Sequence, residues 1–380
     1  MNFDIQKYSH VKTPFYWYDL DLLENTLKQV KDESKRYGYH VHYAVKANAN
    51  ERILQLIRSY GFGADCVSGN EVQASINAGF ESKKVVFAGV GKSDDEIRLG
   101  LQNDIFCFNV ESIPELQVLN ELAGEMEKQA AVALRINPNV NASTHHYITT
   151  GLEENKFGIN MWEMEDVLQA LENLPNVKLI GLHFHIGSQI TDLQSFKGLC
   201  VRVNEIQQWF FARHIIVDHL NMGGGLGINY TDPEKELIPD FASYFQVFHD
   251  FLAVRPKQTV HFELGRALVA QCGNLITKVL YIKKGVQTNF AIVDAGMTEL
   301  IRPALYQAVH KIENLTSIMP EAKYDVVGPI CESSDFFAKA RMLPETQRGD
   351  FLAIRSAGAY GQVMSSEYNL RTKAVAYYSK

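Results

Sequence analysis

The segment His42-Tyr43-Ala44-Val45-Lys46-Ala47-Asn48 is an apolar, strand-like run that ends near a lysine. Burying an ammonium group without a partner is costly, so such a lysine lowers its pKa or acquires a partner. A partly desolvated lysine is also a good amine nucleophile toward a carbonyl compound. The simpler interpretation is a lysine at a strand edge that keeps its charge in water. The sequence around Lys46 decides between these two interpretations.

Short apolar runs alternate with longer amphipathic stretches from about residue 40 to residue 266. Each stretch is long enough to hold one helix, so the pattern predicts eight strand-then-helix units. An α/β fold, a (β/α)8 barrel over residues 26–266, is therefore expected, with an open doubly wound sheet as the alternative. The predicted strands are Val41–Val45, Phe62–Val67, Lys84–Ala88, Ile105–Asn109, Ala131–Ile136, Leu179–His185, His219–Met222 and Val260–Glu263.

The pattern changes after Arg266, where strand-like runs with turn signals replace the helical stretches. This change predicts a second, C-terminal β-rich domain, a β-barrel or sandwich, made of residues 1–25 and 267–380. Residues 1–25 are included because Phe15–Tyr18 is also strand-like. The other predicted strands of this domain are Leu275–Val286, Asn289–Val293, Tyr324–Val327, Asp350–Ser356 and Lys373–Tyr378.

Charge and composition exclude several classes of protein. The 380 residues carry a net charge of −7 and no Lys/Arg-rich run, so we expect no nucleic-acid or membrane-surface partner. No apolar stretch is long enough to span a bilayer, and the first residues lack the features of a secretory signal. The five scattered cysteines form neither a disulfide framework nor a zinc ribbon, which favours a reducing, cytoplasmic location.

Polar residues cluster where the predicted strands end. The carboxyl ends of barrel strands converge on one mouth, which is where the active sites of such barrels are built. We therefore expect one site at that mouth. The residues concerned are Lys46, Asp65, His185, Gly223–Gly225 and Glu263–Arg266.

Two of these motifs leave alternatives open. His183 and His185 lie on the same face of a strand, but no third ligand with suitable spacing supports a metal site. His185 can instead lie flat against a planar cofactor while Ser188 donates to an anion. The glycines of Asn221-Met222-Gly223-Gly224-Gly225-Leu226-Gly227 form either a phosphate-binding loop or a plain tight turn.

The segment Glu263-Leu264-Gly265-Arg266 completes the set. Arg266 suits a phosphate, and Glu263 can accept a hydrogen bond from a ring nitrogen, although the two also resemble an exposed ion pair. An amine nucleophile, a carboxylate for a pyridine nitrogen and a phosphate cradle are the parts that a pyridoxal 5′-phosphate enzyme requires.

These motifs resemble the fold-type III pyridoxal-phosphate decarboxylases, which act on ornithine, arginine or diaminopimelate. Three further motifs are similar to the diaminopimelate decarboxylases, and the resemblance covers essentially the entire chain. They are Asp294-Ala-Gly-Met297 with Arg302-Pro-Ala-Leu-Tyr306, then Gly328-Pro-Ile-Cys331-Glu332-Ser333, then Gly358-Ala-Tyr360-Gly361.

The resemblance implies a role for each residue. Lys46 forms the Schiff base, His185 stacks on the cofactor ring and Glu263 contacts the pyridine nitrogen, while Cys331 is the candidate proton donor. Cys331 and Glu332 are implied to enter the active site of the neighbouring subunit of a homodimer. The implied phosphate ligands are Ser188, Gly224, Gly225, Gly265, Arg266 and Tyr360, and the implied substrate ligands are Arg266, Arg302, Tyr306, Glu332 and Tyr360.

The implied reaction is decarboxylation of meso-2,6-diaminoheptanedioate at its D-centre to L-lysine, the last step of lysine biosynthesis. The distal end of that substrate carries a carboxylate for Arg302, which ornithine would leave unpaired. A related decarboxylase of carboxynorspermidine, ornithine or arginine is the first alternative. A non-catalytic pyridoxal-phosphate carrier built on a single barrel is the second.

Overall fold

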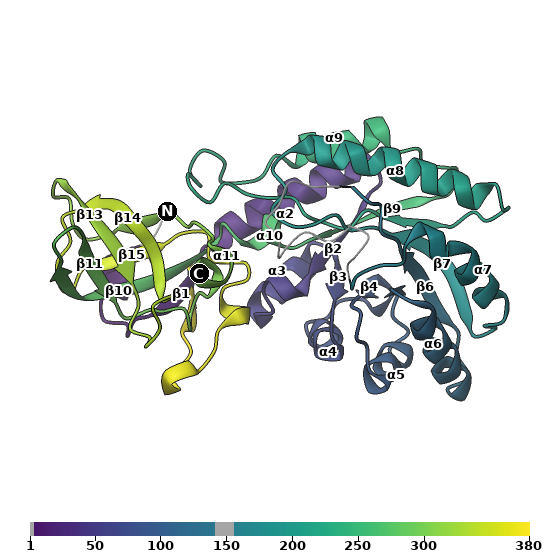
Figure 1. Ribbon diagram of the computed structural model, residues 1–380, viewed down its shortest axis with the longest axis horizontal. Coiled ribbons are helices and arrows are strands. Elements are labelled where there is room, and N and C mark those ends of the chain that lie inside the picture. Colours follow the sequence, from purple (N-terminus) through teal and green to yellow (C-terminus); the bar gives the residue numbers. More distant parts are fainter. Residues whose placement is uncertain (1–3, 141–155) are drawn as a thin grey trace. The chain divides into compact units, whose positions relative to one another are not determined.

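A computed structural model of the protein describes residues 4–140 and 156–380 (Figure 1). Contacts divide the described chain into two compact units. The barrel unit comprises Leu27–Gly227 and Asp240–Gly265, and the sheet unit comprises residues 4–26, Ile228–Pro239 and Arg266–Lys380. Residues 228–239, which the sequence placed in the barrel, therefore group with the sheet unit.

The barrel unit is built on a closed parallel barrel that has eight strands within the described residues. Strand β9 pairs with β2 in parallel, with His42 opposite Glu263, and this pairing closes the ring. Closure confirms the predicted (β/α)8 barrel over the open doubly wound sheet, which would leave two unpaired edges. The strands are β2 (His40–Ala44), β3 (Gly63–Cys66), β4 (Val85–Phe87), β5 (Cys107–Val110), β6 (Ala130–Arg135), β7 (Val177–His183), β8 (His219–Asn221) and β9 (Thr259–Leu264).

Helices connect these strands and lie outside them (Figure 1). Their first turns are stabilised by side-chain caps: Ser68 and Ser112 each accept a hydrogen bond from the backbone N–H three residues later. Ser93 and Glu96 form a reciprocal capping box. The helices are α2 (Leu20–Arg36), α3 (Glu51–Ser59), α4 (Gly69–Asn77), α5 (Asp94–Gln102), α6 (Ile113–Glu125), α7 (Met164–Glu172), α8 (Leu193–Phe211) and α9 (Phe241–Phe251).

The sheet unit contains a mostly antiparallel sheet, which confirms the predicted β-rich second domain. Its main path runs β12-β15-β10-β11-β13-β14, and β1 pairs with both β10 and β16. The strands are β1 (Phe15–Tyr18), β10 (Gly273–Lys284), β11 (Asn289–Val293), β12 (Ile312–Asn314), β13 (Glu321–Val327), β14 (Phe336–Pro344), β15 (Phe351–Ile354) and β16 (Val375–Tyr378). Its short helices are α1 (Ile5–Tyr8), α10 (Arg266–Val269) and α11 (Arg302–Tyr306).

Two of these strands were not predicted, for different reasons. Strand β12 has only three residues, too few for a periodic pattern. Strand β14 lies at the end of the sheet path, and its register shifts against β13. Exposed Lys339 and Ala340 interrupt its buried side chains. An edge strand that carries charge and an irregular register does not show the alternation that identifies a strand.

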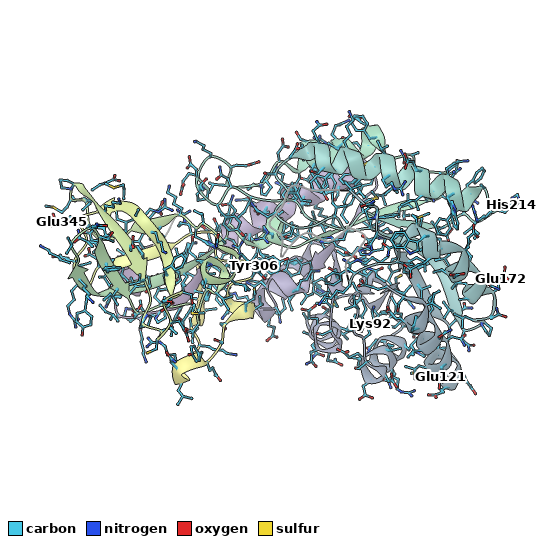
Figure 2. All side chains as sticks on the ribbon, in the orientation of Figure 1. Lys92, Glu121, Glu172, His214, Tyr306 and Glu345 are labelled. Atoms are coloured by element: carbon cyan, nitrogen blue, oxygen red, sulfur yellow. The ribbon has the colours of Figure 1, made fainter. Side chains whose placement is uncertain are left out.

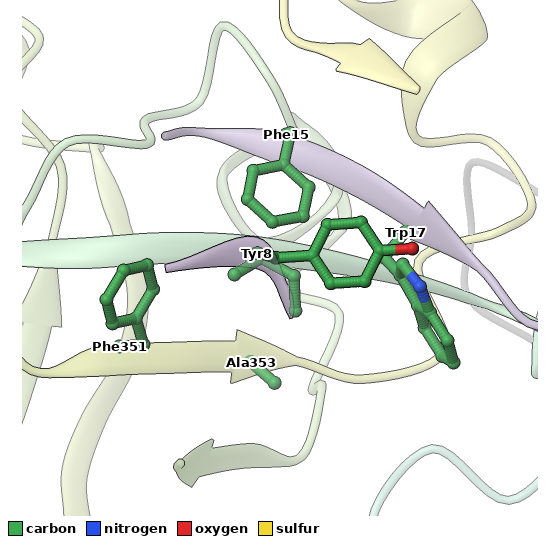
Figure 3. Close-up of a cluster of buried hydrophobic side chains, with 6 residues drawn as sticks. Tyr8, Phe15, Trp17, Phe351 and Ala353 are labelled. Carbon is green, nitrogen blue, oxygen red and sulfur yellow. The ribbon is translucent and has the colours of Figure 1, made fainter. Parts of the chain in front are cut away.

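Aromatic side chains form the core where β1 joins the sheet unit. Phe15 and Trp17 are almost fully buried and pack with Tyr8, Phe351 and Ala353 (Figure 3). Such side chains each bury a large apolar area, so this cluster stabilises the attachment of the N-terminal strand. Among the described helices, none combines the length and apolar character needed to cross a lipid bilayer.

Candidate active site

Lys46 lies in a single 3-10 turn, η1 (Val45–Ala47), that directly follows β2. Its Nζ donates to Oδ2 of Asp65, at 2.6 Å, and Asp65 lies near the end of the neighbouring strand β3. The Lys46 side chain is 37% exposed, whereas that of Asp65 is 0% exposed. Lys46 is therefore not an edge lysine with its charge only in water, because it is paired with a buried carboxylate at the barrel mouth.

Of the two charges in this pair, the negative charge of Asp65 is the less well compensated by its surroundings. Burial raises the pKa of the Asp65 carboxyl above its usual range; Glu263 acts in the same direction, and Lys46 opposes both. Oδ1 of Asp65 has no hydrogen-bond partner among the described residues. The charge of Asp65 therefore depends on the Lys46 ammonium beside it.

Glu263, the penultimate residue of β9, is buried at the centre of a polar network. Its Oε1 accepts hydrogen bonds from the amides of Asn109 (3.0 Å) and Asn221 (2.7 Å). Its Oε2 accepts one from Nε2 of His183 at 2.9 Å. Burial raises the pKa of Glu263, but His183 and Lys46 outweigh it and hold the pKa below its usual range. The network therefore keeps a carboxylate ionised inside the barrel.

The two histidines at the end of β7 occupy different positions. His183 ends β7 and is 1% exposed, whereas His185 lies two residues beyond the strand and is half-buried. Burial lowers the pKa of His185 to about 3, and the charges of Arg135 and Lys46 act in the same direction. His185 is therefore a neutral ring at neutral pH. Metal-ligating side chains do not group in threes or more anywhere in the described part of the chain.

The glycine run after β8 is required by close backbone packing. A Cβ on Gly224 would lie 1.9 Å from the carbonyl oxygen of Glu263, and one on Gly223 would lie 2.2 Å from that of Phe184. Gly223 and Gly225 also have positive φ angles of 69° and 106°. The run therefore lies tightly between the ends of β7 and β9. Ser188 is half-buried beyond β7, and Gly265 follows β9 beside Ala47.

Two buried arginines contact Tyr230 in the sheet unit. Nη1 of Arg266 donates to the Tyr230 hydroxyl at 2.5 Å, and its Cζ lies 4.8 Å from the Tyr360 ring centroid. Cζ of Arg302, the first residue of α11, lies 4.6 Å from the Tyr230 ring centroid. Both Arg266 and Glu263 are 6% exposed, which excludes an exposed ion pair between them.

Arg302 is a buried cation without a carboxylate. It is 5% exposed, and no carboxylate of the described residues lies within ion-pair distance of it. Burial lowers the pKa of Arg302, and the charge of Arg266 acts in the same direction. Tyr306 ends the same short helix and is half-buried (Figure 2). A buried guanidinium in this state suits an incoming anion.

Cys331 and Glu332 lie between β13 and β14 on the surface of the sheet unit. Cys331 is exposed, whereas the other four cysteines are buried. The Cys331 backbone N–H donates to Asn369 at 3.1 Å, and the Tyr368 hydroxyl donates to Glu332 at 2.7 Å. These two residues are thus held together on a solvent-facing segment.

The sequence did not single out several residues that complete these networks. Asn109 and Asn221 each lie at or near the end of a buried strand, so their polarity was a usable signal. Tyr230 and His310 had no such signal, because only tertiary packing brings them to Arg302.

Comparison with known proteins places the chain in a family. The profile of the family described as "Pyridoxal-dependent decarboxylase, pyridoxal binding domain" matches residues 20–270. A diaminopimelate decarboxylase of Bacteroides thetaiotaomicron is 59% identical over 378 residues, which cover 99% of this chain and 98% of that relative. One of Vibrio cholerae is 45% identical over 362 residues, 95% of this chain and 86% of that relative. The chain belongs to the diaminopimelate decarboxylase family.

Solved structures of the family agree with this membership. A Helicobacter pylori diaminopimelate decarboxylase complexed with L-lysine has a TM-score of 0.93 at 40% identity, covering 99% of this chain and 93% of that one. One from m. jannaschii, in co-complex with L-lysine, has a TM-score of 0.90 at 36% identity, with coverages of 99% and 89%. The resemblance inferred from the motifs is confirmed, and pyridoxal phosphate is the cofactor of the family.

Proposed function

We propose that this chain decarboxylates meso-2,6-diaminoheptanedioate at its D-centre, releasing carbon dioxide and L-lysine. The observation that carries the proposal is the Lys46–Asp65 pair of 2.6 Å at the barrel mouth of a chain 59% identical to a diaminopimelate decarboxylase. The reaction is the last step of lysine biosynthesis. The roles of individual residues in this reaction are part of the proposal.

Pyridoxal phosphate fits the groups at the barrel mouth. Lys46 offers an amine, and Glu263 offers a carboxylate that accepts three hydrogen bonds and still has an acceptor position. The bound cofactor would supply an aldehyde that captures amino groups and a ring that takes up the electron pair left by carbon dioxide. The residues that would hold its phosphate are Ser188, Gly224, Gly225, Gly265, Arg266 and Tyr360.

Glu263 would hold a proton on the cofactor's ring nitrogen. This task needs a carboxylate that stays ionised although it is buried, and His183, Asn109 and Asn221 donate to it for that purpose. His185, neutral because burial lowers its pKa, would lie flat against the ring. A neutral imidazole adds no positive charge beside the ring, and such a charge would disfavour protonation of the ring nitrogen.

Asp65 would take up the proton that Lys46 must lose to become a nucleophile. Its Oδ2 already accepts the Lys46 hydrogen bond, and burial raises its pKa toward that of a useful base. Asp65 also keeps the lysine amine at the end of β3 when the amine is free. The sequence alone placed Asp65 at the barrel mouth but assigned it no acid–base role.

Arg302, Tyr306 and Glu332 would select the substrate by its distal end. That end of diaminoheptanedioate carries a carboxylate, which suits buried Arg302 and Tyr306, and an ammonium, which suits Glu332. Ornithine has no carboxylate there and would leave Arg302 buried and unpaired. This cost would discriminate against decarboxylation of ornithine.

Cys331 and Glu332 would act in the active site of a second subunit. Both are exposed, and Tyr368 and Leu370 beside them are 49% and 98% exposed. Large exposed apolar side chains of this kind are typical of a protein interface. We infer a homodimer with shared active sites, in which the Cys331 thiol would return a proton to Cα. A thiol with this task favours the reducing cytoplasm.

The test is carbon dioxide release from meso-diaminoheptanedioate by the purified protein loaded with pyridoxal phosphate. Release of one carbon dioxide per L-lysine is expected, with none from the Lys46→Ala variant and an unchanged rate for Lys178→Ala, which alters an exposed lysine. Turnover of ornithine or arginine in place of diaminoheptanedioate would select the alternative function. No release from any of them would refute the proposal.

A further inference from the structure

A cavity lies at the amino end of the barrel strands, the end opposite to Lys46. Its volume is about 590 Å³, within the range of small-molecule sites. It lies in the barrel unit, below the starts of β2, β3, β4 and β9. None of the residues placed at the barrel mouth lines this cavity, so the proposed function does not account for it.

Flat rings line one wall of this cavity. The rings of His40 and His261 are stacked at 4.8 Å, and those of Phe106 and His261 at 5.3 Å. His219 meets Phe106 edge to face at 4.9 Å. His261 is buried within this stack, whereas His40 is exposed and Phe106 is half-buried, so the outer rings offer the flat surface on which another ring can stack.

Hydrogen bonds orient three of the imidazoles that line this cavity, those of His42, His261 and His219. His42 donates from Nδ1 to the carbonyl oxygen of Lys84 (3.0 Å), so its Nε2 must accept from Nδ1 of His261 (2.9 Å). Nε2 of His261 then accepts from Thr259, whose hydroxyl accepts from Nδ1 of His219 at 2.7 Å. Both ring nitrogens of His42 and both of His261 are thereby used in a directed chain of hydrogen bonds rather than left for a metal ion.

The charged side chains that line this cavity are of one sign. Its 18 lining residues include Lys31, Lys35, Lys83 and Lys84 and no aspartate or glutamate, in a chain with a net charge of −7. Glu81, outside the lining, pairs with Lys84 at 2.7 Å. Both side chains of that pair are largely exposed, so an incoming anion can compete for Lys84 at little cost. A cleft lined by one sign of charge concentrates ligands of the opposite sign.

We propose that this cavity is a second binding site, for a small planar aromatic anion such as a nucleoside monophosphate. The ring of the ligand stacks on the outer rings of the wall, those of His40 and Phe106. Its anionic group lies among the lysines at the rim. The site is independent of pyridoxal phosphate and of the reaction at the barrel mouth.

Isothermal titration of the holoenzyme with AMP tests the proposal, after unbound pyridoxal phosphate has been removed by desalting, because the free cofactor is itself a planar aromatic anion. We expect one AMP per chain and an affinity that falls with added salt. Adenosine lacks the charge and ribose 5-phosphate lacks the ring, so each should bind at least about tenfold more weakly. Equal binding of either compound would overturn the assignment of an aromatic anion.

Variants locate the bound AMP. The double variant Lys35→Gln/Lys83→Gln removes two exposed charges, and Phe106→Leu removes a flat face, so each should weaken binding at least about fivefold. Lys178→Gln alters an exposed lysine of the barrel outside the cavity and should bind AMP as the parent does. The proposal fails if AMP does not bind saturably, if the double variant binds equally well, or if AMP releases the bound pyridoxal phosphate from the protein.

Discussion

Arg302 donates from Nη1 to Nε2 of His310 at 2.9 Å, and both side chains are buried. Because arginine can only donate, the proton of His310 must be on Nδ1, which donates to the Arg355 carbonyl oxygen at 2.8 Å. Burial lowers the pKa of His310 to about 3, and the charge of Arg302 acts in the same direction. A neutral histidine therefore orients the guanidinium proposed to bind the substrate without adding charge.

Replacing His310 by phenylalanine should impair substrate binding more than chemistry. The ring contact with Tyr230 can remain, but Arg302 loses its acceptor, and hydrogen bonds to charged groups contribute about 1.5–3 kcal/mol. We expect the KM for diaminoheptanedioate to rise about tenfold or more with a smaller change in kcat. Steady-state kinetics measure both, with exposed His10→Phe as the control. A fall in kcat at unchanged KM would contradict the orienting role.

Replacing Glu263 by glutamine should abolish most of the activity. The amide has no negative charge, and its NH2 group would face the donors Asn109, Asn221 or His183. Loss of a preorganised electrostatic partner lowers kcat about 100-fold or more. The measurement is kcat at saturating substrate and cofactor, with Glu165→Gln at an exposed position as the control. Activity within twofold of the parent would exclude the role proposed for Glu263.

Gly224→Ala should destabilise the barrel, because its Cβ would lie 1.9 Å from the Glu263 carbonyl oxygen. A clash with backbone cannot be relieved by rotating a side chain, so a loss of about 3 kcal/mol or more is expected. Urea unfolding at pH 7 measures it. Gly91→Ala is the matched control, since nothing lies within 4 Å of its Cβ. Equal unfolding midpoints for the two variants would disprove the packing argument.

Acid should weaken the fold through the histidines at the amino end of the barrel. Burial lowers the pKa of His42 to about 4, whereas an unfolded histidine has a pKa of about 6.5. Between these values the unfolded chain binds more protons, so the free energy of unfolding falls as the pH drops. His42 alone accounts for about 2 kcal/mol between pH 7 and pH 5.

The measurement is the free energy of unfolding in urea at several pH values between 7 and 5. The His42→Gln variant, compared with its own value at pH 7, should lose less stability on acidification than the parent. Identical slopes for both proteins would show that His42 is not the group that titrates.

Cys331 should be protected from thiol reagents by assembly and by substrate. It is the exposed cysteine of the five, so an unassembled chain should react at one thiol. In the proposed dimer its modification should slow at protein concentrations that favour assembly and slow again with diaminoheptanedioate. Sedimentation and thiol titration at matched concentrations measure this. A modification rate independent of both would count against a shared active site.

Much of the fold followed from local pattern. Each of the eight barrel strands lies within two residues of its predicted bounds at both ends, because buried parallel strands are continuous apolar runs flanked by helices. The missed strands β12 and β14 were short or irregular. The grouping of residues 228–239 with the sheet unit depends on tertiary contacts, such as that of Tyr230 with Arg266, which no local pattern contains.

The candidate site was likewise predictable from local pattern only in part. Lys46, His185 and Glu263 each mark a strand end by a polar side chain after an apolar run, and this signal is local. The partners that set their charge come from other strands, as Asp65 does for Lys46 and Asn109 for Glu263. Their pairing is fixed by barrel closure, and a single sequence does not display it.

Strand β1 pairs in parallel with β16, Phe15 opposite Val375, so one of the first strands of the chain is completed by one of the last. During synthesis on the ribosome, the barrel strands up to Leu264 emerge long before residues 375–378 do. The barrel unit can therefore form before Phe15 and Trp17 have strand β16 as a partner in their sheet. A chain truncated before residue 375 would have an unpaired edge at β1, a feature that favours aggregation and proteolysis.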